Sequence, residues 1–227
     1  MQPKILGTPL SVLELTLESD EQVLVAAGHT AWMDASLQMH PTAMTHGGLW
    51  GAIKRTAGGG GWFWTSLRGP GRVGIAATLP GSIESIALTA QSGVLAHRHA
   101  FLAGTDHVQV SMGFQRQLGA GIFGGDGFVL QHLSGDGTAW IQLGGSFVPY
   151  DLAPGEELLV HPQHVGLFED HMPFRMVTVH GIKNMIFGNE GIFFCKLTGP
   201  GRVWCQSMAL EQLAADLIPF LPTAKPQ

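Results

Sequence analysis

Two histidines separated by one residue, His97 and His99, are the side chains in this sequence best suited to chemistry. If both lie on one β-strand, they point to the same side, and their imidazoles could bind one metal ion. Metal sites of this kind often add a glutamate four or five residues later, where this chain has Ala103 and Gly104. Scattered histidines more often have surface or hydrogen-bonding roles, so we predict no metal site and no cofactor and keep His97 and His99 as weak candidates. Three further histidines could converge with this pair: His107, His161 and His164.

The two cysteines, Cys195 and Cys205, offer less support for nucleophilic catalysis. Cys195 lies in an apolar run, where burial raises the pKa of a thiol and makes it a poor nucleophile. Both cysteines lie five residues from Pro200, so they could face each other across a hairpin and form a disulfide, or remain reduced. We favour the reduced pair, because the chain is expected to be cytoplasmic. The sequence therefore predicts no catalytic residue and no enzyme activity.

A repeated string of residues determines how these side chains would be positioned. The stretch from Gly191 to Trp204 resembles earlier stretches that begin at Gly61 and Gly127, at spacings of 66 and 64 residues. Each has a glycine, three large apolar residues, two variable residues, leucine, one variable residue and Gly-x-Gly. A second string precedes each copy and aligns Leu24, Leu95 and Leu159. This pattern predicts a single domain, 1–227, built from three repeats at about 8–77, 82–143 and 146–208.

Each half of a repeat is predicted to be a β-hairpin. The Gly-x-Gly segments at 69–71, 135–137 and 199–201 stand where tight turns need the positive φ that glycine adopts without strain. The fold class that follows is all-β, with three pseudo-repeats of β-hairpins in a β-barrel or double-stranded β-helix arrangement.

The strand before each Gly-x-Gly segment is apolar on both faces, which requires cover from both sides. We expect the three repeats to pack around one shared pseudo-threefold core. We expect other subunits of a homotrimer or larger homo-oligomer to cover the outer face, although burial inside one sandwich would explain the same residues. The predicted core or interface residues are Trp62, Trp64, Phe128, Ile192 and Phe194.

Two segments interrupt the repeats. The first repeat has a long insertion, 44–60, in which Leu49 to Thr56 could form a short helix. A C-terminal helix is predicted at 208–217, capped by Ser207 and packed on the barrel, followed by a tail at 218–227.

Composition excludes several classes of partner. The chain has 227 residues and a formal charge of −5, and its 12 lysines and arginines do not cluster, so no nucleic-acid partner is expected. The sequence shows no signal peptide and no apolar run long enough to span a bilayer. We therefore expect a cytoplasmic protein without a transmembrane segment; peripheral membrane association remains compatible with the sequence.

Five motifs together resemble the bacterial and archaeal family related to the yeast altered-inheritance-of-mitochondria protein. They begin at Gly47, Leu79, Phe123, Leu152 and Gly199, with the sequences GGLWGAIKRT, LPG, FGGDGF, LAPG and GPGRVWCQS. The resemblance runs from about Thr8 to Leu213. It implies a fold similar to that of the tryptophan RNA-binding attenuation protein (TRAP), usually assembled with other subunits, and it supplies no catalytic residues.

Two departures limit what the resemblance implies. The chain has no basic set to match the RNA-binding residues of TRAP, and it lacks the targeting segment of mitochondrial relatives. Our leading hypothesis is a non-enzymatic scaffold or partner-binding module that holds an unknown protein partner. The alternatives are a cupin-like metal-dependent enzyme or small-molecule binder and, least favoured, TRAP-like RNA binding.

Overall fold

The computed structural model describes residues 1–42, 64–116, 128–179 and 192–221, and these form four β-sheets and one short C-terminal helix. The first sheet has the order β1 (Gln2–Leu6), β2 (Val12–Leu17), β7 (Gly71–Ala76) and β4 (Thr30–Met33). The second has the order β5 (Gln38–Thr42), β6 (Trp64–Arg68), β3 (Gln22–Ala26), β10 (Phe101–Thr105), β13 (Gly137–Gly144) and β8 (Gly81–Leu88).

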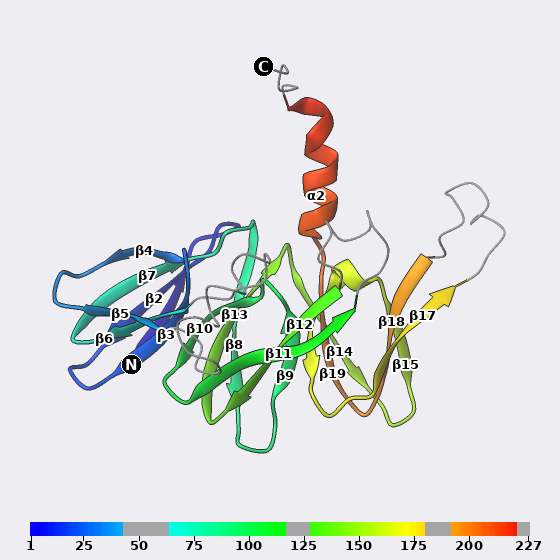
Figure 1. The fold of residues 1–227 in the computed structure, drawn as a ribbon, viewed down its shortest axis with the longest axis horizontal. Coiled ribbons are helices and arrows are strands. Elements are labelled where there is room, and N and C mark those ends of the chain that lie inside the picture. Colours follow the sequence, from blue (N-terminus) through cyan, green and yellow to red (C-terminus); the bar gives the residue numbers. More distant parts are fainter. Residues whose placement is uncertain (43–63, 117–127, 180–191, 222–227) are drawn as a thin grey trace, which may run out of the picture.

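The remaining sheets follow along the molecule (Figure 1). The third has the order β11 (Val108–Arg116), β12 (Phe128–Gly135), β9 (Val94–His97), β16 (Val165–Glu169), β19 (Gly201–Gln206) and β14 (Phe147–Leu152). The fourth has the order β15 (Glu157–Val160), β18 (Ile192–Thr198) and β17 (Phe174–Val179). A 3-10 turn, η1 (Pro162–His164), links β15 to β16. The mainly β class is thus confirmed, but the predicted closed barrel is not found, because none of the four sheets closes on itself within the described residues.

The predicted hairpins around the Gly-x-Gly segments are wrong. The strands on either side of each segment lie in different sheets: β6 and β7, β12 and β13, and β18 and β19. Each turn is therefore an arch that carries the chain from one sheet to the next. Gly201 shows why glycine is needed, because φ is +146° and an added Cβ would lie 2.6 Å from the Met172 side chain. Strand β12 is buried on both faces from Phe128 to Gln131, which explains its apolar sequence, whereas Phe193 and Phe194 of β18 are half-buried.

Two strand pairs join segments distant in sequence within the six-stranded sheets. β3 pairs antiparallel with β10, with Leu24 opposite Gly104, and β9 pairs antiparallel with β16, with Leu95 opposite Phe168. We call these pairs the internal junctions. They connect one part of the molecule to the next.

Buried apolar side chains form three clusters, in place of the single shared core expected from the sequence. One is centred on Leu13, Val73 and Ile75, a second on Phe101, Ile141 and Leu167, and a third on Phe128, Phe168 and Val203. The clusters follow one another along the molecule because the chain crosses from one sheet to the next at each arch. The core is consequently distributed along the molecule.

The C-terminal helix α2 (Leu210–Leu217), followed by the 3-10 turn η3 (Ile218–Phe220), extends away from the sheets (Figure 1). It begins two residues later than predicted, and Ser207 does not cap it, because the Ser207 hydroxyl oxygen accepts a hydrogen bond from the Ser146 N–H at 2.8 Å. No residue of α2 is fully buried, and Phe220 is 84% exposed. The predicted packing is thus limited to the first turn of the helix, where Leu210 lines a cavity and Glu211 approaches His97 and Arg98.

Candidate functional site

A cavity lies between two turns, the turn from β3 to β4 and the turn from β9 to β10. We call this cavity of about 410 Å³ the turn pocket. Helix α2 contributes Leu210 to its wall, and β6, β12 and β13 contribute Trp64, Gln131 and Gln142. The turns themselves provide three polar side chains: His29, Arg98 and His99.

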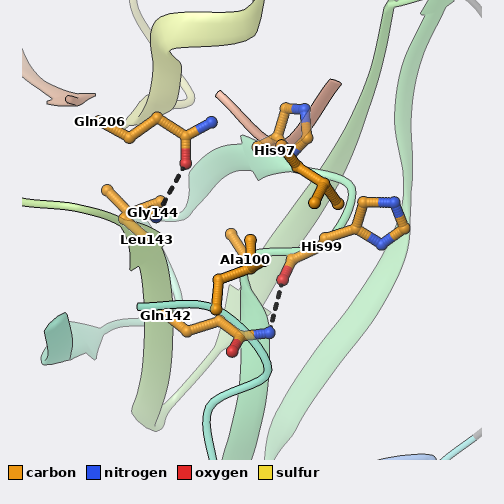
Figure 2. A pocket seen from close by; sticks show the side chains of 9 residues that line it. His97, His99, Ala100, Gln142, Leu143, Gly144 and Gln206 are labelled. Carbon is orange, nitrogen blue, oxygen red and sulfur yellow. Dashed lines mark hydrogen bonds between the residues drawn. The ribbon is translucent and has the colours of Figure 1, made fainter. Parts of the chain in front are cut away.

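A second, much smaller cavity of about 20 Å³ adjoins the same turn (Figure 2). It is shared by His97, His99 and two glutamines, Gln142 and Gln206. The His97–His99 segment thus contributes to both hollows, which is why we treat this turn as the centre of the candidate site.

The two histidines do not sit on one strand as predicted. His97 is the last residue of β9 and is buried, whereas His99 lies in the following turn and is exposed. Their ring centroids are 5.9 Å apart and their planes are inclined by 54°. The alternation that would align residues i and i+2 applies only within a strand, so the spacing alone was misleading.

Burial, together with the smaller effects of the neighbouring His99 and Arg98, lowers the pKa of His97 to about 3. Its Nε2 lies 4.0 Å from the Glu211 Oε1 of α2, and the Arg98 guanidinium lies at the same distance from that oxygen. Because burial keeps His97 neutral, we regard its contact with Glu211 as polar rather than as a full ion pair. Arg98 is therefore the charged partner of Glu211, whose buried Oε2 has no hydrogen-bond partner.

Two glutamines hold the turns in place. Gln142 donates from Nε2 to the His99 carbonyl at 3.0 Å and accepts at Oε1 from the Thr78 N–H at 3.0 Å. Gln206 repeats this arrangement, donating to the Gln163 carbonyl at 2.7 Å and accepting from the Gly144 N–H at 3.2 Å (Figure 2 shows the last contact). Each amide thus fixes a turn on one side and a chain segment on the other. We call these two side chains the glutamine clasps.

Sequence reasoning missed the glutamine clasps, although a signal was present. Gln142 and Gln206 each stand five residues after the last glycine of a Gly-x-Gly segment, while Ala76 holds the equivalent place after Gly71. A polar residue that recurs at the end of an otherwise apolar strand could have been singled out for this reason.

The other histidines named from the sequence lie apart from this pair. His161 precedes the η1 turn and His164 ends it, with ring centroids 6.1 Å apart, and His107 lies between β10 and β11. Within the part of the chain that the structure describes, no three histidine, cysteine, aspartate or glutamate side chains are grouped so that they could hold a metal ion.

The aromatic and apolar residues assigned to a core or interface have different environments. Trp64 and Phe128 are buried at 5% and 1% exposure, whereas Phe194 is half-buried. Ile192 begins β18, and Trp62 lies outside the described residues, as does the helix predicted at Leu49 to Thr56.

Cys195 and Cys205 are free thiols on strands of different sheets, β18 and β19, so they are not opposed across a hairpin. Burial raises the pKa of Cys195 to about 12 and also raises the pKa of the half-buried Cys205. Neither thiol is activated as a nucleophile.

Comparison with known proteins places the chain in a family. The family model described as mitochondrial biogenesis AIM24 matches residues 4–208. The chain belongs to the mitochondrial biogenesis AIM24 family. This membership confirms the resemblance deduced from the five motifs, which were spread over nearly the same range.

Two relatives from Streptococcus pyogenes share the length of the chain as well. An uncharacterised protein of serotype M6 is 28% identical over 222 residues, which cover 94% of this chain and 88% of the relative. A crystal structure of another protein from this organism matches with a TM-score of 0.76 at 24% identity, covering 97% of this chain and 99% of that one. The AIM24-family fold described above therefore recurs over the full length of a solved structure.

In the described residues, no helix has the length and apolar character needed to cross a membrane.

Proposed function

We propose that the protein is a non-enzymatic scaffold that assembles head to tail with copies of itself, through pairing of β4 of one copy with β15 of the next. The observation that carries this proposal is the pair of open edges. Within the described residues, β4 pairs only with β7, and β15 pairs only with β18. An edge strand presents unpaired N–H and C=O groups, which another strand can satisfy.

In the alignment of the three predicted repeats, the two edge strands β4 and β15 correspond to the strands that pair at the internal junctions. Met33 lies opposite Val73 in the β4–β7 pair, as Gly104 lies opposite Ala139 and Phe168 lies opposite Val203. Strand β4 therefore corresponds to β10 and β16. On the other side, the alignment of Leu24, Leu95 and Leu159 makes β15 correspond to β3 and β9.

The same alignment fixes the register of the proposed contact. Gly104 lies opposite Leu24 and Phe168 lies opposite Leu95, so Met33 of one copy would lie opposite Leu159 of the next. At the internal junction, Phe168 is 0% exposed and Leu95 is 8% exposed, whereas Met33 is 38% and Leu159 is 48% exposed. Large apolar side chains that stand exposed at these places support cover by a second copy.

An interface that joins two different edges is heterologous, and such interfaces produce closed rings when the rotation between copies permits. We propose a closed homotrimer, in which the four-stranded sheet of one copy and the three-stranded sheet of the next join into one continuous sheet at each boundary. This arrangement would make the assembly similar to TRAP, a ring of related β units, and would give the scaffold a repeated outer surface on which to hold a protein partner.

Light scattering on the purified full chain tests the assembly. We expect a mass three times that of the 24.2 kDa chain for the wild type, and a mass near that of one chain for Leu159→Lys, because charge on an edge strand prevents edge pairing. Met112→Lys is the matched control, since Met112 is also exposed, at 56%, but lies on β11. A wild-type monomer at micromolar concentration, or a Leu159→Lys protein that keeps the wild-type mass, would overturn the proposal.

A further inference from the structure

We propose that the turn pocket binds a small organic anion that has a flat apolar body and a hydrogen-bond donor. This inference is independent of the assembly proposed above, because every residue it uses belongs to one chain. The cavity of about 410 Å³ is of the size that small-molecule sites usually have.

The charge of the pocket favours an anion. Its lining contains one arginine, Arg98, and two histidines, His29 and His99, and it includes no aspartate or glutamate among the described residues. Glu211 approaches Arg98 to 4.0 Å but does not line the cavity. A carboxylate or phosphate in the pocket would therefore meet cationic and N–H groups without facing a like charge.

His29 is oriented for such a contact by the backbone. Its Nδ1 lies 2.9 Å from the Ala76 carbonyl oxygen, which can only accept a hydrogen bond, so Nδ1 carries the hydrogen. The ring is thereby fixed in the pocket wall. This fixed orientation reduces the entropy that a ligand would have to overcome on binding.

Gln131 indicates the donor. Its side chain lines the pocket on β12, the residue is only 4% exposed, and its Oε1 has no hydrogen-bond partner. An unpaired buried amide oxygen is destabilising unless something donates to it. Because Gln131 lines the cavity, a ligand N–H or O–H bound there could supply the missing bond.

The fold itself does not require a glutamine at this position. In the alignment of the predicted repeats, Gln131 corresponds to Thr65 and Cys195, neither of which has an amide. Gln142, by contrast, already uses both ends of its amide as a clasp. Gln131 is therefore the amide of the pocket that is available to a ligand.

The apolar wall defines the body of the ligand. Trp64 is 5% exposed and lines the pocket beside Phe101, while Leu79 and Leu210 contribute aliphatic surface. Aromatic and aliphatic surface around a few convergent polar groups is the usual composition of a site for a flat organic molecule.

Titration calorimetry with three probes tests the proposal on the full chain. 3-Hydroxybenzoate has the anion and the donor, benzoate lacks the donor, and phenol lacks the anion. We expect saturable binding of one 3-hydroxybenzoate per chain, about tenfold weaker binding of benzoate, and weaker binding still of phenol. Failure of 3-hydroxybenzoate to bind saturably at millimolar concentration would overturn the proposal.

Two variants separate the roles of the polar groups. Gln131→Leu should bind 3-hydroxybenzoate and benzoate equally and should unfold at the wild-type temperature or above it, because it removes an unpaired polar atom. Arg98→Gln should weaken both acids at least tenfold and leave phenol unchanged. Met112→Ala, on the exposed face of β11, serves as the control that keeps wild-type affinities. The assigned contacts would be wrong if Gln131→Leu kept the wild-type preference for 3-hydroxybenzoate over benzoate, or if Arg98→Gln bound both acids with wild-type affinity.

Discussion

The internal junctions and the open ends of this molecule use corresponding strands but differ in what covers them. At the junction of β9 and β16, Leu95 and Phe168 are buried by other parts of the same chain. At the ends, Met33 of β4 and Leu159 of β15 hold the corresponding positions and are exposed. An exposed apolar residue on an edge strand thus resembles an interface residue once its buried counterparts in the other repeats are identified.

Removing the two corresponding side chains, one at a time, should have very different effects on stability. Phe168→Ala leaves a cavity where a fully buried ring packs edge to face on Phe174 at a centroid distance of 5.1 Å, so we expect a loss of about 3–5 kcal/mol in the free energy of unfolding. Met33→Ala should cost less than about 1 kcal/mol under conditions in which the protein is monomeric. Urea denaturation at low protein concentration measures both values, and equal losses would contradict the comparison.

The glutamine clasps provide the next largest effect, because they are present beside the internal junctions and absent from the first predicted repeat. Gln206→Ala should reduce the free energy of unfolding by about 1–3 kcal/mol, since it leaves the Gln163 carbonyl and the Gly144 N–H without this partner. Gln212→Ala is a suitable control, because the Gln212 side chain donates to the exposed Asp216 within α2 itself. A loss no greater than that of the control would show that the clasps are dispensable.

Histidine protonation should weaken the junction that contains β9 at acidic pH. The pKa of His97 is about 3 in the folded protein and about 6.5 when unfolded, so the unfolded state binds the proton more strongly. Its contribution to stability is complete above pH 6.5 and is lost as the pH falls toward 3, by about 1.4 kcal/mol at pH 5.5.

Thermal or urea unfolding from pH 7.5 to pH 4 measures this dependence. His97→Leu should flatten it, whereas His107→Gln, at an exposed turn, should retain the wild-type dependence. An unchanged slope in His97→Leu would mean that other groups determine the acid sensitivity.

The smallest expected effect is on the rate at which Cys195 is alkylated, which reports whether the edge strand β15 stays paired with β18. Cys195 lies opposite Val160 of β15, is 0% exposed, and has a pKa raised to about 12 by burial. We expect iodoacetamide at pH 8 to modify Cys195 only when β15 separates from β18, so labelling should be slow in buffer and faster in dilute urea. Peptide mass spectrometry distinguishes it from the half-buried Cys205, and rapid labelling of Cys195 in buffer would show that β15 is already detached.

The sequence was sufficient for the strand content and for the family. Apolar strings of constant spacing, separated by glycines, predict short strands joined by tight turns. The five motifs indicated the family correctly. The arches were not predictable, because a Gly-x-Gly turn looks the same in sequence whether its two strands pair with each other or with strands of two different sheets.

The candidate site was predicted only in part. The segment His97 to His99 does line both cavities, but its two histidines were expected to point the same way, and the end of β9 between them removes that alternation. The clasps escaped notice because their roles depend on contacts 43 or more residues away, such as the bond from Gln142 to His99. Such contacts exist only once the sheets are assembled.

The arches also have a consequence for how the chain folds. The strand pairs β11–β12 and β17–β18 are adjacent in sequence, whereas the junction of β9 and β16 joins Leu95 to Phe168 across six intervening strands, β10 to β15. Pairing of distant strands is slow, because the entropic cost of closing a long loop comes before the contacts that offset it. The order of events during synthesis is thereby constrained, because the third sheet cannot form until the ribosome has released β16 and β19, almost at the end of the chain.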